Sequence, residues 1–211
     1  MFITFEGGEG SGKTTQISLL ADYLESQGYE VLKTREPGGT TDGEKIRDLI
    51  VAQSERHDPL FDVFLLFSAR RIHVNEVIKP ALEGNKVVIC DRFTDSTRVY
   101  QGYGLGVDLQ VIETLKILSI GTLEPDLTFV FDINPEIGLS RAKKRSDKDG
   151  TNEQKYETYD KDFHERLRTG FQNLVRQNPG RFVVLDAGQD IDAIRMEIKD
   201  AVTSSHFGKK N

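Results

Sequence analysis

A glycine-rich segment near the N-terminus contains the residue types that hold nucleotide phosphates. Residues 7–14 read GGEGSGKT and fit the pattern G-x-x-x-x-G-K-[ST]. The glycines let successive backbone N–H groups point at an anion, while Lys13 would reach the β- and γ-phosphates and the Thr14 hydroxyl would ligate Mg²⁺. We therefore predict an ATP site built from Gly7, Gly8, Glu9, Gly10, Ser11, Gly12, Lys13, Thr14 and Thr15.

A second candidate lies where an apolar run ends in charged residues. Residues 86–90 are mostly apolar, and Asp91 and Arg92 follow them. An aspartate at the end of a strand often caps a helix, but beside a phosphate-binding loop it suits a carboxylate that directs Mg²⁺. Arg92 would project from the carboxyl edge of a sheet, where ligands bind in such folds, and would clamp a phosphate.

The order of the elements around these residues favours an α/β fold. Short apolar runs alternate with longer amphipathic stretches, as in parallel sheets with crossover helices. We expect one domain, 1–211, with the three-layer fold of P-loop kinases: a five-stranded parallel sheet, helices on both faces and a mobile lid. The predicted strands span residues 2–5, 30–34, 86–90, 127–132 and 181–186, and the predicted helices span residues 15–26, 43–53, 59–82, 109–120, 135–144, 159–177 and 191–203.

The lid is expected at about residues 141–158. Within it, residues 145–157 form a long polar stretch with almost no apolar side chain, which is typical of a mobile flap. A compact chain with a closing flap fits a small-molecule kinase better than a transport ATPase. A switch GTPase is also disfavoured, because Asn85 and Lys86 lead into Val87 and not into the base-reading pattern Asn-Lys-x-Asp.

Composition restricts the expected partners and location. The net charge of −6 argues against a general nucleic-acid binder. No window approaches the roughly 18 consecutive apolar residues of a membrane span, and the N-terminus lacks an export signal, so we expect a soluble cytoplasmic protein. Cys90 is the only cysteine, which excludes an intrachain disulfide, and the histidines have no spacing that suggests a shared metal site.

The chain resembles the thymidylate kinase family over essentially its whole length. This resemblance implies ATP-dependent phosphorylation of dTMP to dTDP, a step of dTTP biosynthesis, with ATP and Mg²⁺ and a homodimeric assembly. The segments that carry it are residues 5–15, the TREPGGT segment 34–40, the FSARR segment 67–71, the Asp91-Arg92 pair, and residues 95–97, 100–102 and 125–128.

The resemblance also assigns roles around the thymidine part of dTMP. Phe67 would stack on the base and Arg71 would donate to its O4, while Gln101 would pair with N3–H and a carbonyl group. Without the resemblance, Phe67 is better interpreted as a core aromatic residue. Tyr100 would stand under the sugar and crowd a 2′-hydroxyl, and Glu9 would face the 3′-hydroxyl and the metal region.

Around the phosphates, the resemblance implies a cluster of arginines. Arg35, Arg47 and Arg92 would surround the acceptor phosphate, although Arg47 is equally well interpreted as a solvated surface charge. The remaining residues that the resemblance places at the substrates are Pro37, Ser96 and Thr97 for dTMP and Arg141 for ATP.

The expected reaction needs no protein base. A phosphate monoester has a second pKa of ~6, so its oxygen is already a nucleophile at neutral pH. In-line transfer then depends on positioning and charge neutralisation by Glu9, Lys13, Arg92 and a cation from the lid. Residues 154–157 read QKYE where many relatives carry an arginine, so the lid cation is either Arg145 or Lys155.

Further departures from the family pattern are Phe93 and Leu105, which we expect to bear on closure or turnover and not on the fold.

Two rival functions remain at this point. A nucleoside kinase would need a carboxylate base, for which Glu6 or Glu36 are available. A nucleotide-binding regulatory module would catalyse no reaction and would have no use for an acceptor pocket.

Overall fold

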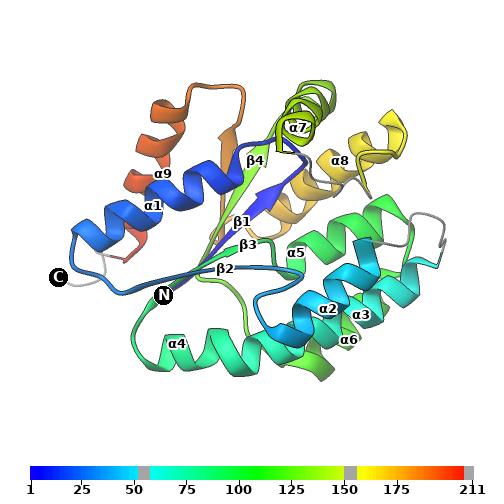
Figure 1. The fold of residues 1–211 in the computed structure, drawn as a ribbon, viewed down its shortest axis with the longest axis horizontal. Helices are drawn as coiled ribbons and strands as arrows, with labels where there is room; N and C mark the ends of the chain where they lie inside the picture. The colour runs from blue at the N-terminus through cyan, green and yellow to red at the C-terminus, as the bar shows by residue number, and fades with distance from the viewer. Residues whose placement is uncertain (52–57, 150–155, 207–211) are drawn as a thin grey trace.

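A computed structural model describes residues 1–51, 58–149 and 156–206 of the chain. Five strands form one sheet in the order β2-β3-β1-β4-β5, and every neighbouring pair is parallel (Figure 1). The sheet confirms the predicted fold class, and each strand lies within two residues of its predicted range. The strands are β1 (Phe2–Gly7), β2 (Val31–Arg35), β3 (Val87–Asp91), β4 (Leu127–Asp132) and β5 (Phe182–Asp186).

Helices cover both faces of the sheet, as predicted. The helices α1 (Lys13–Ser26) and α9 (Ile191–His206) pack on one face (Figure 1). The other face is covered by α4 (Lys79–Glu83), α6 (Leu109–Ile120) and α8 (Lys161–Gln177). Among the described residues, no helix combines the length and apolar character needed to cross a membrane. The remaining long helices are α2 (Thr41–Val51), α3 (Pro59–His73) and α7 (Pro135–Asp149).

Two segments differ from the predicted elements. The predicted helix 59–82 is interrupted by a π-helical stretch, η1 (Val74–Ile78), between α3 and α4. Residues 94–104, where no element is predicted, form α5 (Thr94–Thr97) and a second π-helical stretch, η2 (Arg98–Gly104). This segment has little apolar periodicity because it buries polar side chains instead, among them Thr94, Asp95, Thr97 and Gln101.

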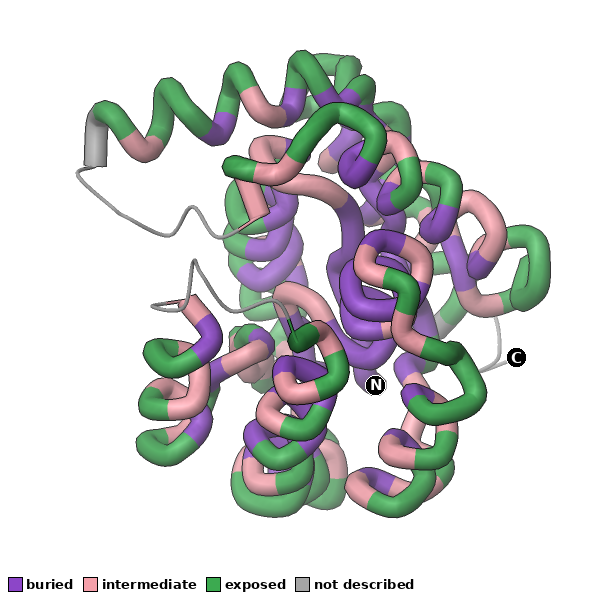
Figure 2. The backbone as a smooth tube through the Cα atoms, turned by 90° about the vertical axis from the view of Figure 1, so that its right-hand side faces the viewer, coloured by how far each residue is buried: buried purple, intermediate pink, exposed green. Residues whose placement is uncertain are grey.

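The alternation of side chains along β1 sends a carboxylate into the core. Ile3 and Phe5 face α1 and α9, whereas Phe2 faces the opposite side of the sheet. Because side chains alternate along a strand, Thr4 and Glu6 share the face of Phe2. Both are completely buried, and buried residues fill the centre of the molecule in Figure 2. Glu6 therefore lies inside the protein, in contact with the segment that contains α5.

Helix α7 begins directly against the glycine-rich loop. A Cβ added at Gly10 would lie 2.0 Å from the Gly138 carbonyl oxygen, and one added at Gly138 would lie 2.6 Å from the Glu9 carbonyl oxygen. The helix continues to Asp149, beyond its predicted end at residue 144, so its basic end enters the predicted lid. Lys155 falls outside the described residues.

Replacing Gly138 with alanine is expected to weaken binding of an ATP analogue about tenfold, or ~1.4 kcal/mol, because the new methyl group must displace the Glu9 carbonyl. Alanine is favoured over glycine in a helix by up to about 1 kcal/mol, so thermal stability should not fall in parallel. Isothermal titration measures the affinity. As a control, Gly180→Ala should bind normally, since its Cβ would meet nothing within 4 Å. Unchanged affinity in Gly138→Ala would contradict the tight contact.

Candidate active site

The loop between β1 and α1 buries the amino group of its lysine. Lys13 is only 7% exposed, and its Nζ donates hydrogen bonds to the carbonyl oxygens of Gly7 and Gly8 at 3.1 and 3.0 Å. Burial and then repulsion from Arg92 lower the pKa of Lys13 to about 8, although nearby carboxylates oppose this shift. A bound phosphate would favour the charged amine. The loop is therefore suited to an anionic ligand.

Thr14 and Asp91 lie together at the mouth of the loop. The Thr14 hydroxyl donates to Asp91 Oδ2 at 3.3 Å. Asp91 Oδ1 and Glu9 Oε2 are buried and have no hydrogen-bond partner in the described parts of the chain. The same parts contain no group of three or more His, Cys, Asp or Glu side chains that could hold a metal ion. Unpaired carboxylate oxygens beside a phosphate loop fit Mg²⁺, which typically binds one or two carboxylates together with phosphates and water.

Arg92 connects the end of β3 to the loop. Its Nη1 donates to the Gly7 carbonyl oxygen at 3.1 Å and its Nη2 donates to Glu9 Oε1 at 3.2 Å. The Tyr100 hydroxyl also donates to Glu9 Oε1, at 2.7 Å, and the Arg92 guanidinium carbon lies 4.9 Å from the centre of the Tyr100 ring. Burial acts to raise the pKa of Glu9, but Arg92 and the Tyr100 hydrogen bond lower it below its ordinary value. Glu9 is thus held as a fixed anion.

One cavity of about 650 Å³ extends from the loop to α2 and α3. This volume lies in the range typical of small-molecule sites, roughly 300–1,000 Å³. The cavity brings together most residues that the sequence predicts for the site. The predicted residues that line it are Glu9, Gly10, Ser11, Gly12, Lys13, Thr14, Thr15, Arg35, Pro37, Arg47, Asp91, Arg92, Ser96, Thr97, Tyr100, Gln101 and Arg145.

Arg35 and Arg47 are held by neighbours on α2 and on the loop before it. Arg35 pairs with Glu44 Oε2 at 2.8 Å. Arg47 Nη1 donates to the Pro37 carbonyl oxygen at 3.1 Å. Both side chains line the same cavity as Arg92.

The placement of Arg71 in this cavity is wrong, and its neighbour Arg70 occupies that position. Arg71 is exposed and donates to the Ser119 carbonyl oxygen at 2.9 Å. Arg70 is 2% exposed and lines the cavity, and its Nε donates to Glu36 Oε2 at 2.6 Å. Arg70 Nη1 is buried without a hydrogen-bond partner in the described residues. A buried donor of this kind needs an acceptor, which a ligand can supply.

Helix α3 contains a signal that favours Arg70. The buried positions Val63, Leu66 and Phe67 form an inward stripe that continues to Arg70 at helical spacing. Arg71 instead follows the exposed positions Phe64 and Ser68. The spacing to Phe67 alone does not discriminate, since residues three and four positions later both lie beside it.

Other predicted residues lie at the edge of the cavity or away from it. Phe67 is 3% exposed, packs with Val63 and Ile112, and has the Arg70 guanidinium carbon 4.8 Å from its ring centre. It does not line the cavity, so the residue predicted to stack on the base lies in the core instead. Arg141 also lies off the cavity and donates to the Ala187 carbonyl oxygen at 2.8 Å.

The lining of the cavity also includes residues from the predicted lid. Gln101 Nε2 donates to the Tyr156 hydroxyl at 2.8 Å, and both side chains line the cavity. Tyr156 was not predicted from the sequence, because it lies in a polar segment without periodicity. Arg145, at the other end of the lid, lines the same cavity. Lys155, the other predicted lid cation, lies outside the described residues, so the choice between the two stays open.

Comparison with known proteins identifies the family of this chain. Residues 5–198 match the sequence profile of the thymidylate kinase family. A thymidylate kinase from Exiguobacterium sp. is 45% identical over 202 residues, which cover 95% of this chain and 92% of the relative. A thymidylate kinase from Bartonella quintana is 47% identical over 203 residues, which cover 94% of this chain and 93% of the relative.

A solved structure has the same fold. The crystal structure of thymidylate kinase from Ehrlichia chaffeensis aligns with a TM-score of 0.77 and 38% sequence identity. The alignment covers 96% of this chain and 98% of that one. Because the profile, the sequence relatives and the fold agree over nearly the full length, this chain belongs to the thymidylate kinase family.

Proposed function

We propose that this chain transfers the γ-phosphoryl group of ATP to the 5′-phosphate of dTMP, giving dTDP and ADP. One observation carries the proposal: a single cavity joins Lys13 of the phosphate loop to the buried, unpaired donor of Arg70. A triphosphate on the loop and a nucleotide whose base reaches Arg70 would then meet inside one enclosure, as in-line transfer requires.

At the donor side, Lys13 and the backbone of the loop bind the phosphates of ATP. Thr14 and Asp91 are the residues that would hold Mg²⁺, whose charge would neutralise the phosphate oxygens when it is bound. Arg92 lies between the loop and the acceptor side, where it binds the acceptor phosphate. Arg35 and Arg47, which line the same cavity, bind this phosphate together with Arg92. These cations offset the repulsion between two anionic substrates.

At the acceptor side, the base is selected by hydrogen-bond polarity. Thymine presents an acceptor at O4, whereas cytosine presents a donor at N4. Arg70 Nη1 is a donor and can satisfy the first group but not the second. Gln101 completes the recognition of the base edge. Tyr100, fixed by Glu9 and Arg92, stands beside the sugar and disfavours a 2′-hydroxyl.

The lid closes the cavity during transfer. Arg145 approaches from the end of α7, while Tyr156 and Glu157 approach from the other end of the lid. Closure excludes water, which would otherwise accept the phosphoryl group. Arg145 then supplies positive charge to the transferring phosphoryl group. The whole chain acts as a single domain in the cytoplasm.

We further propose a homodimer through α3 and α6. These helices are in contact and expose large apolar side chains to solvent: Phe64 is 50% exposed, Ile117 60% and Leu118 71%. Such a patch is unusual on a monomer and suits a self-complementary two-fold contact.

An acceptor panel tests the function. ADP release should be fastest, in kcat/KM, with dTMP, and lower with dUMP, dCMP, dGMP, UMP and thymidine. A preference for thymidine over dTMP would indicate a nucleoside kinase instead. Failure of every acceptor to stimulate ADP release, with ATP binding intact, would favour a regulatory nucleotide-binding module.

Substitution of the two neighbouring arginines tests base recognition. Arg70→Lys removes the planar fork but keeps the charge, so kcat/KM for dTMP should fall about 10- to 100-fold, ~1.4–2.7 kcal/mol, and the preference for dTMP over dCMP should shrink. Arg71→Lys is the matched control and should keep both values within about twofold. Loss of the dTMP preference in Arg71→Lys alone would reverse the assignment.

The oligomeric state is tested with a charge on the proposed contact. Leu118→Glu should convert the dimer to a monomer in light scattering, because a buried carboxylate without a partner strongly destabilises an apolar interface. Met196→Glu, on α9, introduces the same charge at a similarly exposed position and should leave the dimer intact. A monomeric parent protein would refute the proposed dimer.

A further inference from the structure

Arg92 has a backbone conformation that must be held by its surroundings. Its φ is 69°, in the left-handed region that residues other than glycine seldom adopt. The peptide groups on both sides of Arg92 are tied to β1: Arg92 N donates to the Phe5 carbonyl oxygen at 3.0 Å, and Phe93 N donates to Glu6 Oε1 at 2.8 Å. Glu6 therefore supports the turn that presents Arg92.

The same carboxylate orients the side chain of Arg92 through Ser96. The Ser96 hydroxyl donates to Glu6 Oε2 at 2.5 Å, and Arg92 Nη1 donates to the Ser96 hydroxyl oxygen at 3.2 Å. A hydroxyl has a single proton. The Ser96 oxygen can therefore accept from Arg92 only while its own O–H points elsewhere. That O–H donates its hydrogen bond to Glu6. Because a guanidinium group can only donate, Glu6 supplies the acceptor at the end of this hydrogen-bond chain.

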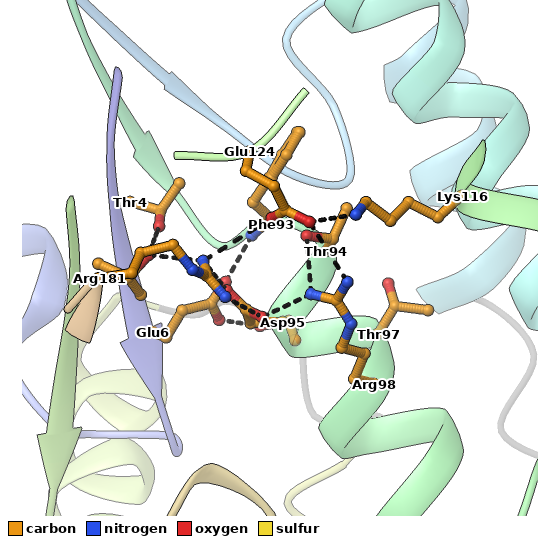
Figure 3. Close-up of polar contacts among 12 residues, drawn as sticks. Thr4, Glu6, Phe93, Thr94, Asp95, Thr97, Arg98, Lys116, Glu124 and Arg181 are labelled. Carbon is orange, nitrogen blue, oxygen red and sulfur yellow. Dashed lines mark hydrogen bonds and ion pairs between the residues drawn. The ribbon is translucent and has the colours of Figure 1, made fainter. Parts of the chain in front are cut away.

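The nearby arginines bind Asp95 and leave Glu6 without an ion pair. Figure 3 shows Arg181 and Arg98 converging on Asp95, with N–O distances of 2.6 and 2.7 Å. Glu6 forms no ion pair with any described residue. Burial and the charge of Asp95 raise the pKa of Glu6 to about 7, although Ser96 and Arg92 act to lower it.

This arrangement is costly for the fold. A buried carboxylate without a countercharge destabilises the folded state. Both oxygens of Glu6 are instead occupied by the Phe93 amide and the Ser96 hydroxyl. Glu6 does not line the substrate cavity. Within the described residues, its side-chain hydrogen bonds go to Phe93, which follows Arg92, and to Ser96, which accepts from Arg92.

We propose that Glu6 is a positioning residue for phosphoryl transfer, which fixes both the backbone and the guanidinium group of Arg92. The inference rests on the proposed role of Arg92 at the acceptor phosphate. It differs from the rival role of a general base, because Glu6 is separated from the cavity by Arg92 and Ser96.

The test combines Glu6→Gln with Arg92→Ala. The glutamine keeps the size of the side chain but replaces one carboxylate oxygen with an NH₂ donor. The NH₂ group cannot accept the hydrogen bond that the replaced oxygen accepted. We expect kcat/KM for dTMP to fall about tenfold or more, with KM for ATP changed less than about twofold. In the Arg92→Ala background, Glu6→Gln should cause no further loss, because residues that act through one another are not additive.

The outcomes separate this inference from the proposed function. A large loss in Arg92→Ala combined with normal kinetics in Glu6→Gln would overturn the inference alone. Additive losses would also overturn it, since Glu6 would then act by another route. Normal dTMP phosphorylation by Arg92→Ala would refute the role of Arg92 and the inference together.

Two further variants separate positioning from loss of structure. Ser96→Ala breaks the side-chain link and keeps the Glu6 contact with Phe93, so it should show the same non-additivity even where Glu6→Gln does not fold. Thr4→Val is the matched control: Thr4 shares the strand and face of Glu6, and its hydroxyl lies 2.7 Å from that of Thr128. Thr4→Val should lower Tm without changing KM for dTMP. An equal kinetic loss in Thr4→Val would assign the effect to core packing and contradict positioning.

Discussion

The Arg92 guanidinium group links the two sides of the substrate cavity. It donates to the Gly7 carbonyl and to Glu9 at the phosphate loop, and to Ser96 on α5, at 3.1 to 3.2 Å. A planar guanidinium presents its donors in fixed directions. The loop and α5 therefore cannot move apart without breaking one of these bonds. In the proposed reaction, this rigidity lets the donor and acceptor phosphates meet in one geometry.

The same edge of the sheet concentrates charges that the core must tolerate. Parallel strands bring their carboxyl ends together, so Glu6 in β1 and Asp91 in β3 lie close to Lys13 at the start of α1. Burial lowers the pKa of Lys13 to about 8 and raises the pKa of Glu6 to about 7. Both shifts arise because burial destabilises the charged form of each group, which water would stabilise. The free-energy cost of burying these charged groups is thus offset by the apolar packing of the sheet.

Most of the fold follows from local sequence patterns, and the exceptions have a physical cause. The strands β3 and β4 are nearly continuous apolar runs, as a buried parallel strand requires. The edge strands β2 and β5 are only partly buried. Residues 94–104 were not predicted as helical because Asp95, Thr97 and Gln101 are buried through contacts with Arg181, Arg70 and Tyr156. Such partners are far away in sequence, and no periodicity records them.

The sequence by itself determined the phosphate loop, the Asp91-Arg92 pair and the family, because these depend on residue types at fixed local spacing. The tertiary structure decided between Arg70 and Arg71, since both follow Phe67 closely on a helix and only burial separates them. It also revealed the contacts of Glu6. A strand pattern predicts which face a side chain occupies, but the Phe93 amide and the Ser96 hydroxyl reach Glu6 only once β3 and α5 are packed against β1.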